Sequence, residues 1–201
     1  MDNKNFNSIA WDVKRVFKCS INRKEKQLNR LLVLVDTEKE KEEILSCIDS
    51  TLKESFPEHK INVFRIDLAT KQSMSELSYE VFYKIYESQD QKTKQMKDFS
   101  RWIEDVKKSE GVIGYFGMAP VISINQKYDN VSFGYGLFVF DNLDKANDGV
   151  LNGVKGMYHD GRHCIIPVGW EFISFCSHGA KIFDPSFNVS TIVWDINKYK
   201  D

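Results

Sequence analysis

The stretch that decides the fold is LLVLVDTEKEKEEILSCIDSTLKESF, Leu31–Phe56. It begins with an unbroken apolar run of strand length, as expected for a strand that is buried on both faces of a parallel sheet. Thr37 and Glu40 then have the spacing of a helix capping box. The apolar residues beyond them form one helical stripe: Ile44, Leu45, Ile48, Leu52 and Phe56. This stretch predicts a buried strand followed by a crossover helix.

The same alternation continues on both sides of this stretch. Helical spacing predicts helices over 8–20 and 73–88, and a third over 91–110 with Met96 and Phe99 on its apolar face and Gly111 as its end. Apolar runs predict further strands at 60–68, 111–117, 119–124, 135–141, 163–169 and 190–195, with a helix or loop over 142–158.

We expect one α/β domain over residues 1–201. It would have three layers, a mostly parallel sheet with helices on both faces, P-loop-like or Rossmann-like, and residues 1–30 as a basic N-terminal helical segment.

Composition narrows the function classes. A formal net charge of -1 gives the chain no overall field toward nucleic acid or an anionic membrane, so such a partner needs a local patch. The four cysteines lack CxxC spacing and favour reduced thiols. No signal-peptide pattern is found, and the longest uncharged run, 111–126, is too short to cross a membrane. We therefore expect a cytoplasmic protein without a membrane partner.

A phosphate-binding loop is missing where the fold would place it. A P-loop needs GxxxxGK[ST] between the first strand and its helix, because backbone N–H groups and a lysine surround the phosphate. Here that place reads VDTEKEKEE, without glycine and rich in acids that would repel phosphate. The glycine-rich segment Gly149–Gly156 has neither this spacing nor that of a dinucleotide fingerprint. We expect no bound cofactor.

The order of elements and the motif LFVFD, Leu137–Asp141, together resemble a degenerate core of the P-loop ATPase class that lacks its Walker A motif. The resemblance spans Leu31 to Asp195. It implies a P-loop-like fold, and Asp141 is the position that matches the Walker B acid.

A looser resemblance is to small accessory proteins of bacterial BREX-type phage-resistance systems. It rests on the layout of LLVLVDTEKEKEEI, INVFRIDL and GVIGYFGMAP, whereas the C-terminal pattern of that family is not found. This resemblance implies a role in phage defence and no particular biochemical activity.

Acids end several predicted strands. Asp36, Asp67, Asp141 and Asp195 would meet at the edge where α/β proteins place ligands, and converging carboxylates bind Mg²⁺. The simpler interpretation is that these residues cap helices and begin turns, as Asp36-Thr37 and Asp141-Asn142 suggest. We favour the simpler interpretation because no tight DxD spacing supports a metal.

Zinc-type residues also occur, namely His159, His163, Cys164, Cys176 and His178, but their spacing matches no zinc-finger pattern, and we interpret them as loop and core residues. Neither Cys164 nor Ser174 has the sharp-turn context of a nucleophile.

Basic residues gather at the N-terminus. Residues 1–30 hold eight Lys/Arg and three Asp/Glu, whereas 36–58 hold eight acids and three lysines. These stretches can pair or face solvent. Alternatively the basic segment docks to a partner through Lys14, Arg15, Lys18, Arg23, Lys24 and Arg30. A second strip follows the helix over 91–110: Lys92, Lys94, Lys97, Arg101, Lys107 and Lys108. Trp102 on that helix could stack on a base, but packing is the simpler role.

The favoured hypothesis is a non-enzymatic assembly or adaptor subunit of a bacterial multi-protein system such as phage defence. Its protein contacts would lie on the basic segment and on Met118–Phe133. One alternative is a Mg²⁺-dependent phosphohydrolase, nuclease or nucleotide-binding protein that uses Asp141 with Asp36 and Asp67. Another is a nucleic-acid binder that uses the basic segment. The sequence does not determine the oligomeric state.

Overall fold

The apolar run at Leu31 forms β1 (Arg30–Leu34), an inner strand of a five-stranded sheet. The computed structural model describes residues 4–22, 30–116, 124, 127–128, 133–160, 165–167, 169–178 and 191–196. The strand order is β2-β3-β4-β1-β5, and all of these pairs are parallel. The other strands are β2 (Ile61–Asp67), β3 (Tyr135–Asp141), β4 (Trp170–Cys176) and β5 (Thr191–Asp195).

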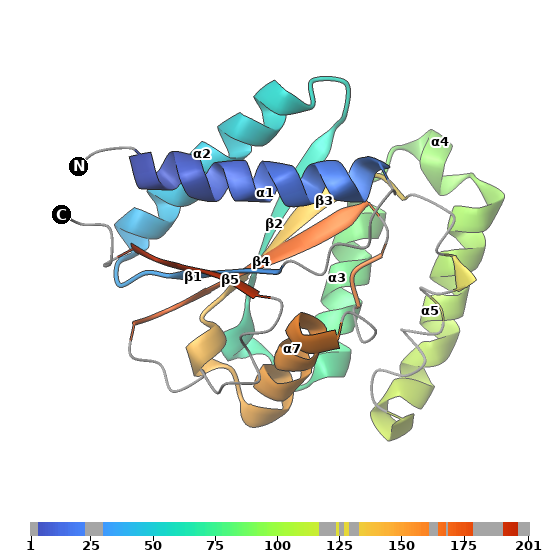
Figure 1. Cartoon of the computed structure of the whole chain (residues 1–201). Coiled ribbons are helices and arrows are strands. Elements are labelled where there is room, and N and C mark those ends of the chain that lie inside the picture. Colours follow the sequence, from blue (N-terminus) through green and yellow to red (C-terminus); the bar gives the residue numbers. More distant parts are fainter. Residues whose placement is uncertain are drawn as a thin grey trace.

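Helices cover both faces of this sheet (Figure 1). On one face lie α1 (Lys4–Asn22) and α2 (Glu38–Ser55). On the other lie α3 (Met74–Ser88) and α7 (Asp148–Asp160), with α5 (Lys97–Phe116) packed outside α3. Three short turns of helix complete the described elements: η1 (Leu68–Thr70), α4 (Gln91–Lys94) and η2 (Leu143–Lys145).

The residues of β1 alternate between two hydrophobic cores. Leu31 and Val33 belong to the core beneath α1 and α2, whereas Leu32 and Leu34 belong to the core on the side of α3, α5 and α7. Successive side chains of a strand point to opposite faces, so a strand with a core on each side must be apolar throughout. The three-layer α/β class with a parallel sheet is confirmed.

The predicted helix starts are also present. Thr37 is the N-cap of α2, and its capping box with Glu40 is complete. Ser73 caps α3 through the backbone N–H of Glu76. The expected apolar stripe of α1 is buried, with Ile9 and Phe17 fully inaccessible.

The predicted strand over 111–117 is wrong, because α5 continues through Gly111 to Phe116. A glycine inside a helix costs about 1 kcal/mol relative to alanine, which is too little to end a long helix that packs against its neighbours. Met96, expected on the apolar face, lies just before α5 and is 49% exposed. Of the next expected strand, 119–124, only Ile124 is described, and it is helical.

The strand predicted over 163–169 is displaced toward the C-terminus. Of that run, Ile165–Pro167 are described and are not in a strand, and β4 instead begins at Trp170. Pro167 lacks the N–H that a central strand must donate, and Glu171 hides the apolar character of the true strand. Trp170 lies directly over Gly136, where an added Cβ would come within 2.1 Å of the indole ring.

The structure also bears on several smaller predictions. The segment predicted as a helix or loop over 142–158 contains η2 and most of α7. Trp102 is fully buried and packs against Phe82, Phe99 and Phe133, so its role is packing. Cys47 and Cys176 are free thiols. No described helix is long and apolar enough to cross a membrane.

Candidate functional site at the sheet edge

The candidate site lies beyond the carboxyl ends of the strands, where ligands bind in open parallel sheets. Asp67 and Asp141 are register partners at the ends of β2 and β3. Asp36 follows β1, and Asp195 ends β5. The sheet thus brings the four predicted acids to one edge.

Asp141 is buried, with only 5% of its surface exposed, and faces two cations. Its Oδ2 accepts hydrogen bonds from Arg65 Nε at 3.0 Å and Arg65 Nη2 at 2.9 Å. Its Oδ1 lies 3.4 Å from Lys41 Nζ. A paired bond from one guanidinium is among the stronger charge-assisted contacts. Asp141 is therefore the acceptor of an ion-pair network and not a helix cap, which corrects the simpler interpretation of this residue.

Lys41 and Arg65 are tied to α2 as well. Lys41, also buried, places Nζ 2.7 Å from Glu38 Oε2. Arg65 Nη2 donates to Glu38 Oε1 at 2.9 Å, and Arg65 Nη1 donates to Glu42. We call Glu38, Lys41, Glu42, Arg65 and Asp141 the edge network. It joins the start of α2 to β2 and β3.

The contacts of the edge network favour the charged forms of Glu38 and Arg65. The hydrogen bond from Lys41, with a further one from Arg65, holds the pKa of Glu38 below its ordinary value. Partial burial acts to lower the pKa of Arg65, but hydrogen bonds to Glu38, Asp141 and Glu42 outweigh it and raise that pKa. The network as a whole holds two cations and three carboxylates, so it keeps a formal charge of -1 at neutral pH.

The N-terminus of α2 is likewise occupied by its own side chains. Thr37 Oγ1 accepts from the Glu40 backbone N–H at 3.2 Å, and Glu40 Oε2 accepts from the Thr37 backbone N–H at 3.2 Å. Glu40 is only 6% exposed. In a P-loop protein this helix end receives the phosphate. Here the buried carboxylate of Glu40 accepts a hydrogen bond from the backbone N–H of Thr37, the N-cap residue of the helix. Further acids surround this helix end.

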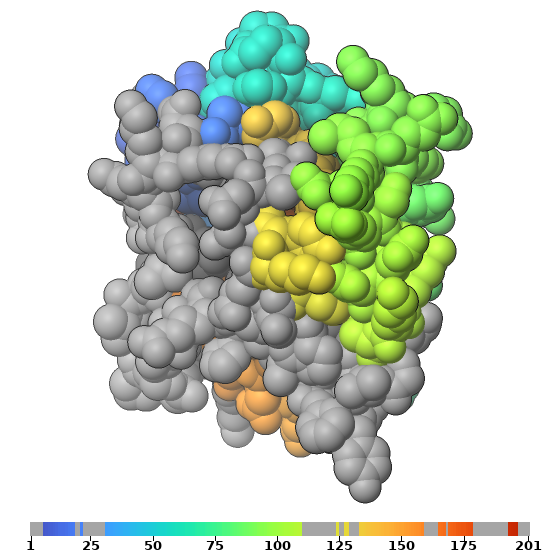
Figure 2. Space-filling view, turned by 90° about the vertical axis from the view of Figure 1, so that its right-hand side faces the viewer, coloured from blue at the N-terminus to red at the C-terminus, as the bar shows by residue number. Residues whose placement is uncertain are grey.

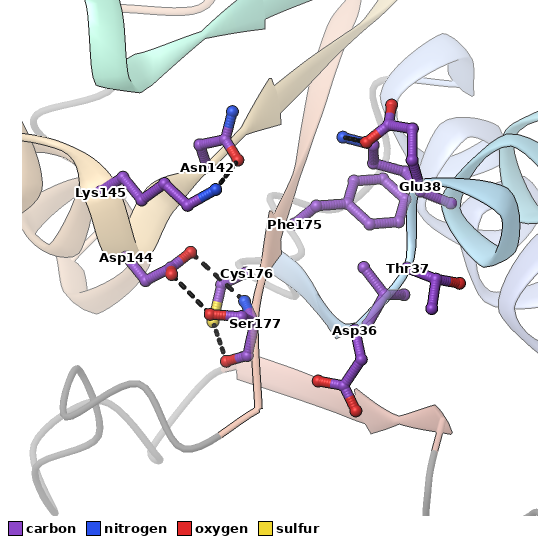
Figure 3. A pocket seen from close by; sticks show the side chains of 11 residues that line it. Asp36, Thr37, Glu38, Asn142, Asp144, Lys145, Phe175, Cys176 and Ser177 are labelled. Atoms are coloured by element: carbon purple, nitrogen blue, oxygen red, sulfur yellow. Dashed lines mark hydrogen bonds and ion pairs between the residues drawn. The ribbon is translucent and has the colours of Figure 1, made fainter.

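A small pocket of about 110 Å³ remains between the ends of β1, β3 and β4 (Figure 3). It is lined by Val35, Asp36, Thr37, Glu38, Lys41, Asn142, Asp144, Lys145, Phe175, Cys176 and Ser177. Asp144 accepts from Ser177 Oγ at 2.5 Å and from its backbone N–H at 3.2 Å, while Lys145 donates to Asn142. The volume suits a few water molecules and is far below that of a nucleotide site.

Cys176 in this pocket is not an activated nucleophile. Burial, with a further contribution from the Asp144 charge, raises the pKa of its thiol to about 12. The thiolate is the reactive form, so this cysteine stays protonated and inert at neutral pH. Ser174, two residues earlier in β4, is fully buried and is equally unsuited to attack a substrate.

The remaining strand-end acids also have partners. Asp36 Oδ1 lies 2.8 Å from His178 Nδ1, and Asp195 Oδ1 lies 2.5 Å from His178 Nε2, which links the ends of β1, β4 and β5. Asp67 caps η1 through the Ala69 backbone N–H and accepts from Asn142 Nδ2. The capping interpretation thus holds for Asp67, whereas the carboxylate of Asp36 contacts the His178 ring.

The structure describes no group of three or more His, Cys, Asp or Glu residues with the geometry of a metal site. That statement covers the described part of the chain. The expected zinc-type residues His163 and Cys164 fall outside it, as does the side chain of His159.

The predicted basic docking residues are only partly described. Lys14, Arg15 and Lys18 lie on α1, Arg30 begins β1, and Arg23 and Lys24 fall outside the described residues. Most of Met118–Phe133 is outside as well. Of its described members, Ile124, Tyr128 and Phe133 are buried and Lys127 is exposed, and both Tyr128 and Lys127 contact Asp105 of α5. Figure 2 shows the described residues of this part of the chain in yellow beside α5 in green.

The sequence analysis missed Lys41 and Arg65. Lys41 precedes Ile44 and Ile48 by three and seven residues, so it lies on the buried stripe of α2, which is a readable signal. Arg65 is a single charge inside an apolar strand next to the strand that ends in Asp141. An unpaired charge on the buried stripe of α2 would be costly, so Lys41 could have indicated an acidic partner. Arg65 gives a weaker signal, because 40% of its side chain is exposed.

Comparison with known proteins gives little further information. No family model matches the chain, and no curated protein matches it. Among solved structures, the ORC1 protein of Aeropyrum pernix in complex with DNA superposes with a TM-score of 0.49 at 10% identity. It covers 96% of this chain and 44% of that one. A Drosophila ORC structure bound to AT-rich DNA and Cdc6 gives 0.44 at 12% identity, covering 96% and 57%. The chain thus spans about half the length of these two.

Proposed function

We propose that this chain is a non-catalytic assembly or adaptor subunit: a P-loop-like α/β domain whose nucleotide position is filled by its own side chains. The observation that carries the proposal is the engagement of Asp141 by Arg65 and Lys41. The strand-end acid that would hold Mg²⁺ instead accepts two hydrogen bonds from Arg65 and forms an ion pair with Lys41.

Phosphate binding is opposed by the same arrangement. A nucleotide at this edge would meet Glu38, Glu40 and Glu42 around the start of α2, where a P-loop offers glycine N–H groups. Lys41 is in the vicinity, but its ammonium already lies between Glu38 and Asp141. The local charge and the small pocket both favour a domain that does not take a nucleoside triphosphate.

The Mg²⁺-dependent alternative needs a different arrangement of the same residues. Asp141 would have to release Arg65 and Lys41, and both would then lose a buried carboxylate. Asp36 and Asp67 would also have to leave His178 and Asn142. This alternative stays a prediction that depends on such a rearrangement.

An adaptor role is consistent with a sheet edge whose nucleotide position is occupied by the chain's own side chains. The described residues form a hydrophobic core on each face of the sheet, which gives a docking subunit a stable scaffold. The bacterial phage-defence setting rests on the sequence layout alone and is proposed on that basis. The segment Met118–Phe133 remains a predicted protein contact next to α5.

The test is co-purification from the native host with a tag on the chain. We expect a partner protein in stoichiometric amount, and the complex should survive EDTA and the removal of nucleotide, because a closed site cannot control assembly. Lys145→Ala, which changes the pocket lining without touching the edge network, serves as the matched variant and should retain the partner. A monomer without a partner, or a complex that forms only with Mg²⁺-ATP, would contradict the proposal.

A further inference from the structure

The outer face of α1 carries an aromatic side chain among cations. Trp11, Lys14, Arg15 and Lys18 occupy positions i, i+3, i+4 and i+7, which share one face of a helix. Trp11 is 58% exposed, more than any other large hydrophobic residue of the described chain. Figure 1 shows α1 lying across one face of the sheet beside α2. We call these four residues the α1 face.

The opposite side of α1 anchors the helix. Ile9, Val13 and Phe17 are buried in the core that α1 shares with α2 and the sheet. Asp12 is the only acid between residues 4 and 22, and its Oδ2 accepts a hydrogen bond at 2.9 Å from Trp194 Nε1. The helix is therefore held in one orientation, and its acid is turned toward β5.

Within the α1 face, Arg15 is the cation that lies against the indole. The Arg15 guanidinium lies over the Trp11 ring at 5.5 Å from its centroid and 3.5 Å from Asp12. Among the described residues, no acid pairs with Lys14 or Lys18. The result is an exposed aromatic surface with positive charge beside it, and the one nearby acid, Asp12, is largely buried and is shared between Arg15 and Trp194.

We propose that the α1 face binds single-stranded nucleic acid, with one base stacked on Trp11 and adjacent phosphates paired with Lys14, Arg15 and Lys18. Aromatic side chains beside a basic track are the usual means of binding unpaired strands, because every base has a face that can stack. In a duplex those faces are covered by neighbouring bases, so an indole on a convex helix has no base to reach.

This site is separate from the sheet edge and goes beyond the proposed adaptor role. An acidic protein segment would use the three cations but would gain little from an exposed indole. The exposed Trp11 ring with Arg15 against it therefore favours nucleic acid over an acidic protein. If both the adaptor role and this binding site hold, the subunit brings single-stranded nucleic acid to its protein assembly.

The experiment measures fluorescence anisotropy of a labelled thymidine oligonucleotide of about 15 nucleotides, a length within the usual single-strand site sizes. Trp11→Ala should weaken binding about tenfold, as expected for the loss of one stacked base. Lys14→Glu combined with Lys18→Glu should weaken it at least as much. With three phosphates engaged, log affinity should fall with log salt at a slope of about -2.

Matched controls lie on other helices. Tyr83, the other exposed aromatic side chain among the described residues, is on α3, and Lys108, whose side chain is 74% exposed, is on α5. Tyr83→Ala and Lys108→Glu should bind within about twofold of the wild type, because neither touches the α1 face. Trp11→Phe keeps an aromatic face and should retain most of the affinity, which separates stacking from any effect on folding.

Three results would overturn the proposal. One is the absence of binding at low salt. Another is unchanged affinity in Trp11→Ala, which would leave charge alone as the cause. The third is equal competition by polyglutamate and by unlabelled oligonucleotide, which would identify an acidic protein surface as the partner. None of these results bears on the edge network, so the two proposals fail separately.

Discussion

Charged side chains are used in opposite ways at the edge of the sheet and on the α1 face. At the edge, Asp141 is buried and its charge is balanced by Arg65 and Lys41. On α1, Lys14 and Lys18 have no acidic partner among the described residues. The comparison shows that the presence of an acid or a base at a suggestive position is not informative by itself. Its partners decide whether it is available to a ligand.

The largest expected effect is at the centre of the edge network. Asp141→Asn removes the charge that balances Arg65 and Lys41, so we expect the free energy of unfolding to fall by about 3 kcal/mol, as for other broken buried ion pairs. Urea unfolding measures it. Asp105→Asn, which removes an acid paired with the exposed Lys127, is the matched control and should cost less than about 1 kcal/mol. Equal losses of unfolding free energy in Asp141→Asn and Asp105→Asn would contradict the special role of the buried Asp141.

A smaller loss is expected on the helix side of the network. Lys41→Met keeps the buried stem and removes the ammonium, while Asp141 retains its bonds to Arg65. We expect a loss of about 1.5 kcal/mol in urea unfolding, typical of one charged hydrogen bond. Lys39→Met, on the exposed side of the same helix turn, should change stability by less than about 0.5 kcal/mol. A stabilised Lys41→Met would mean that the buried ammonium is not needed for the fold.

The pH dependence of stability tests the charge of Glu38. Its pKa is lowered in the folded state from an ordinary value of 4.5, so it contributes stability at higher pH and loses it as the pH falls through the folded pKa. Wild type should therefore exceed Glu38→Gln in stability above about pH 5, and the difference should shrink in more acidic buffer. Urea midpoints across this range measure it. A difference that grows on acidification would contradict the assigned direction.

The smallest effect is expected on the α1 face. Lys14→Gln and Lys18→Gln should each change the free energy of unfolding by less than about 0.5 kcal/mol, because neither side chain supports a described contact. The same urea experiment applies. A loss comparable to that of Asp141→Asn would show that these cations are used within the fold and would weaken the case for a ligand there.

Much of the fold could be predicted from the sequence, because burial on both faces leaves an unmistakable apolar run. Leu31–Leu34 and Leu137–Phe140 are such runs, and the Thr37 capping box fixed the start of α2. The errors arose where local signals were overruled by packing. Gly111 does not end α5, and Glu171 conceals a central strand.

The candidate site was only half predictable. The four strand-end acids lie at one edge as expected, because parallel strands place their carboxyl ends together. Their partners come from elsewhere in the chain: Arg65 is 76 residues from Asp141, and His178 is 142 residues from Asp36. Such pairs depend on strand order and register, which residue spacing does not encode. The sequence indicated where carboxylates gather but not that cations balance them.

The most direct test is the thermal unfolding of the wild-type protein in EDTA, in Mg²⁺ and in Mg²⁺-ATP. A ligand at one hundred times its dissociation constant adds about 2.7 kcal/mol, which in a chain of this size raises the unfolding temperature by about 7 °C. We predict the same unfolding temperature in all three conditions, because the edge network already occupies the site. A rise with Mg²⁺-ATP that Asp141→Asn abolishes would contradict the account and identify Asp141 as a metal ligand.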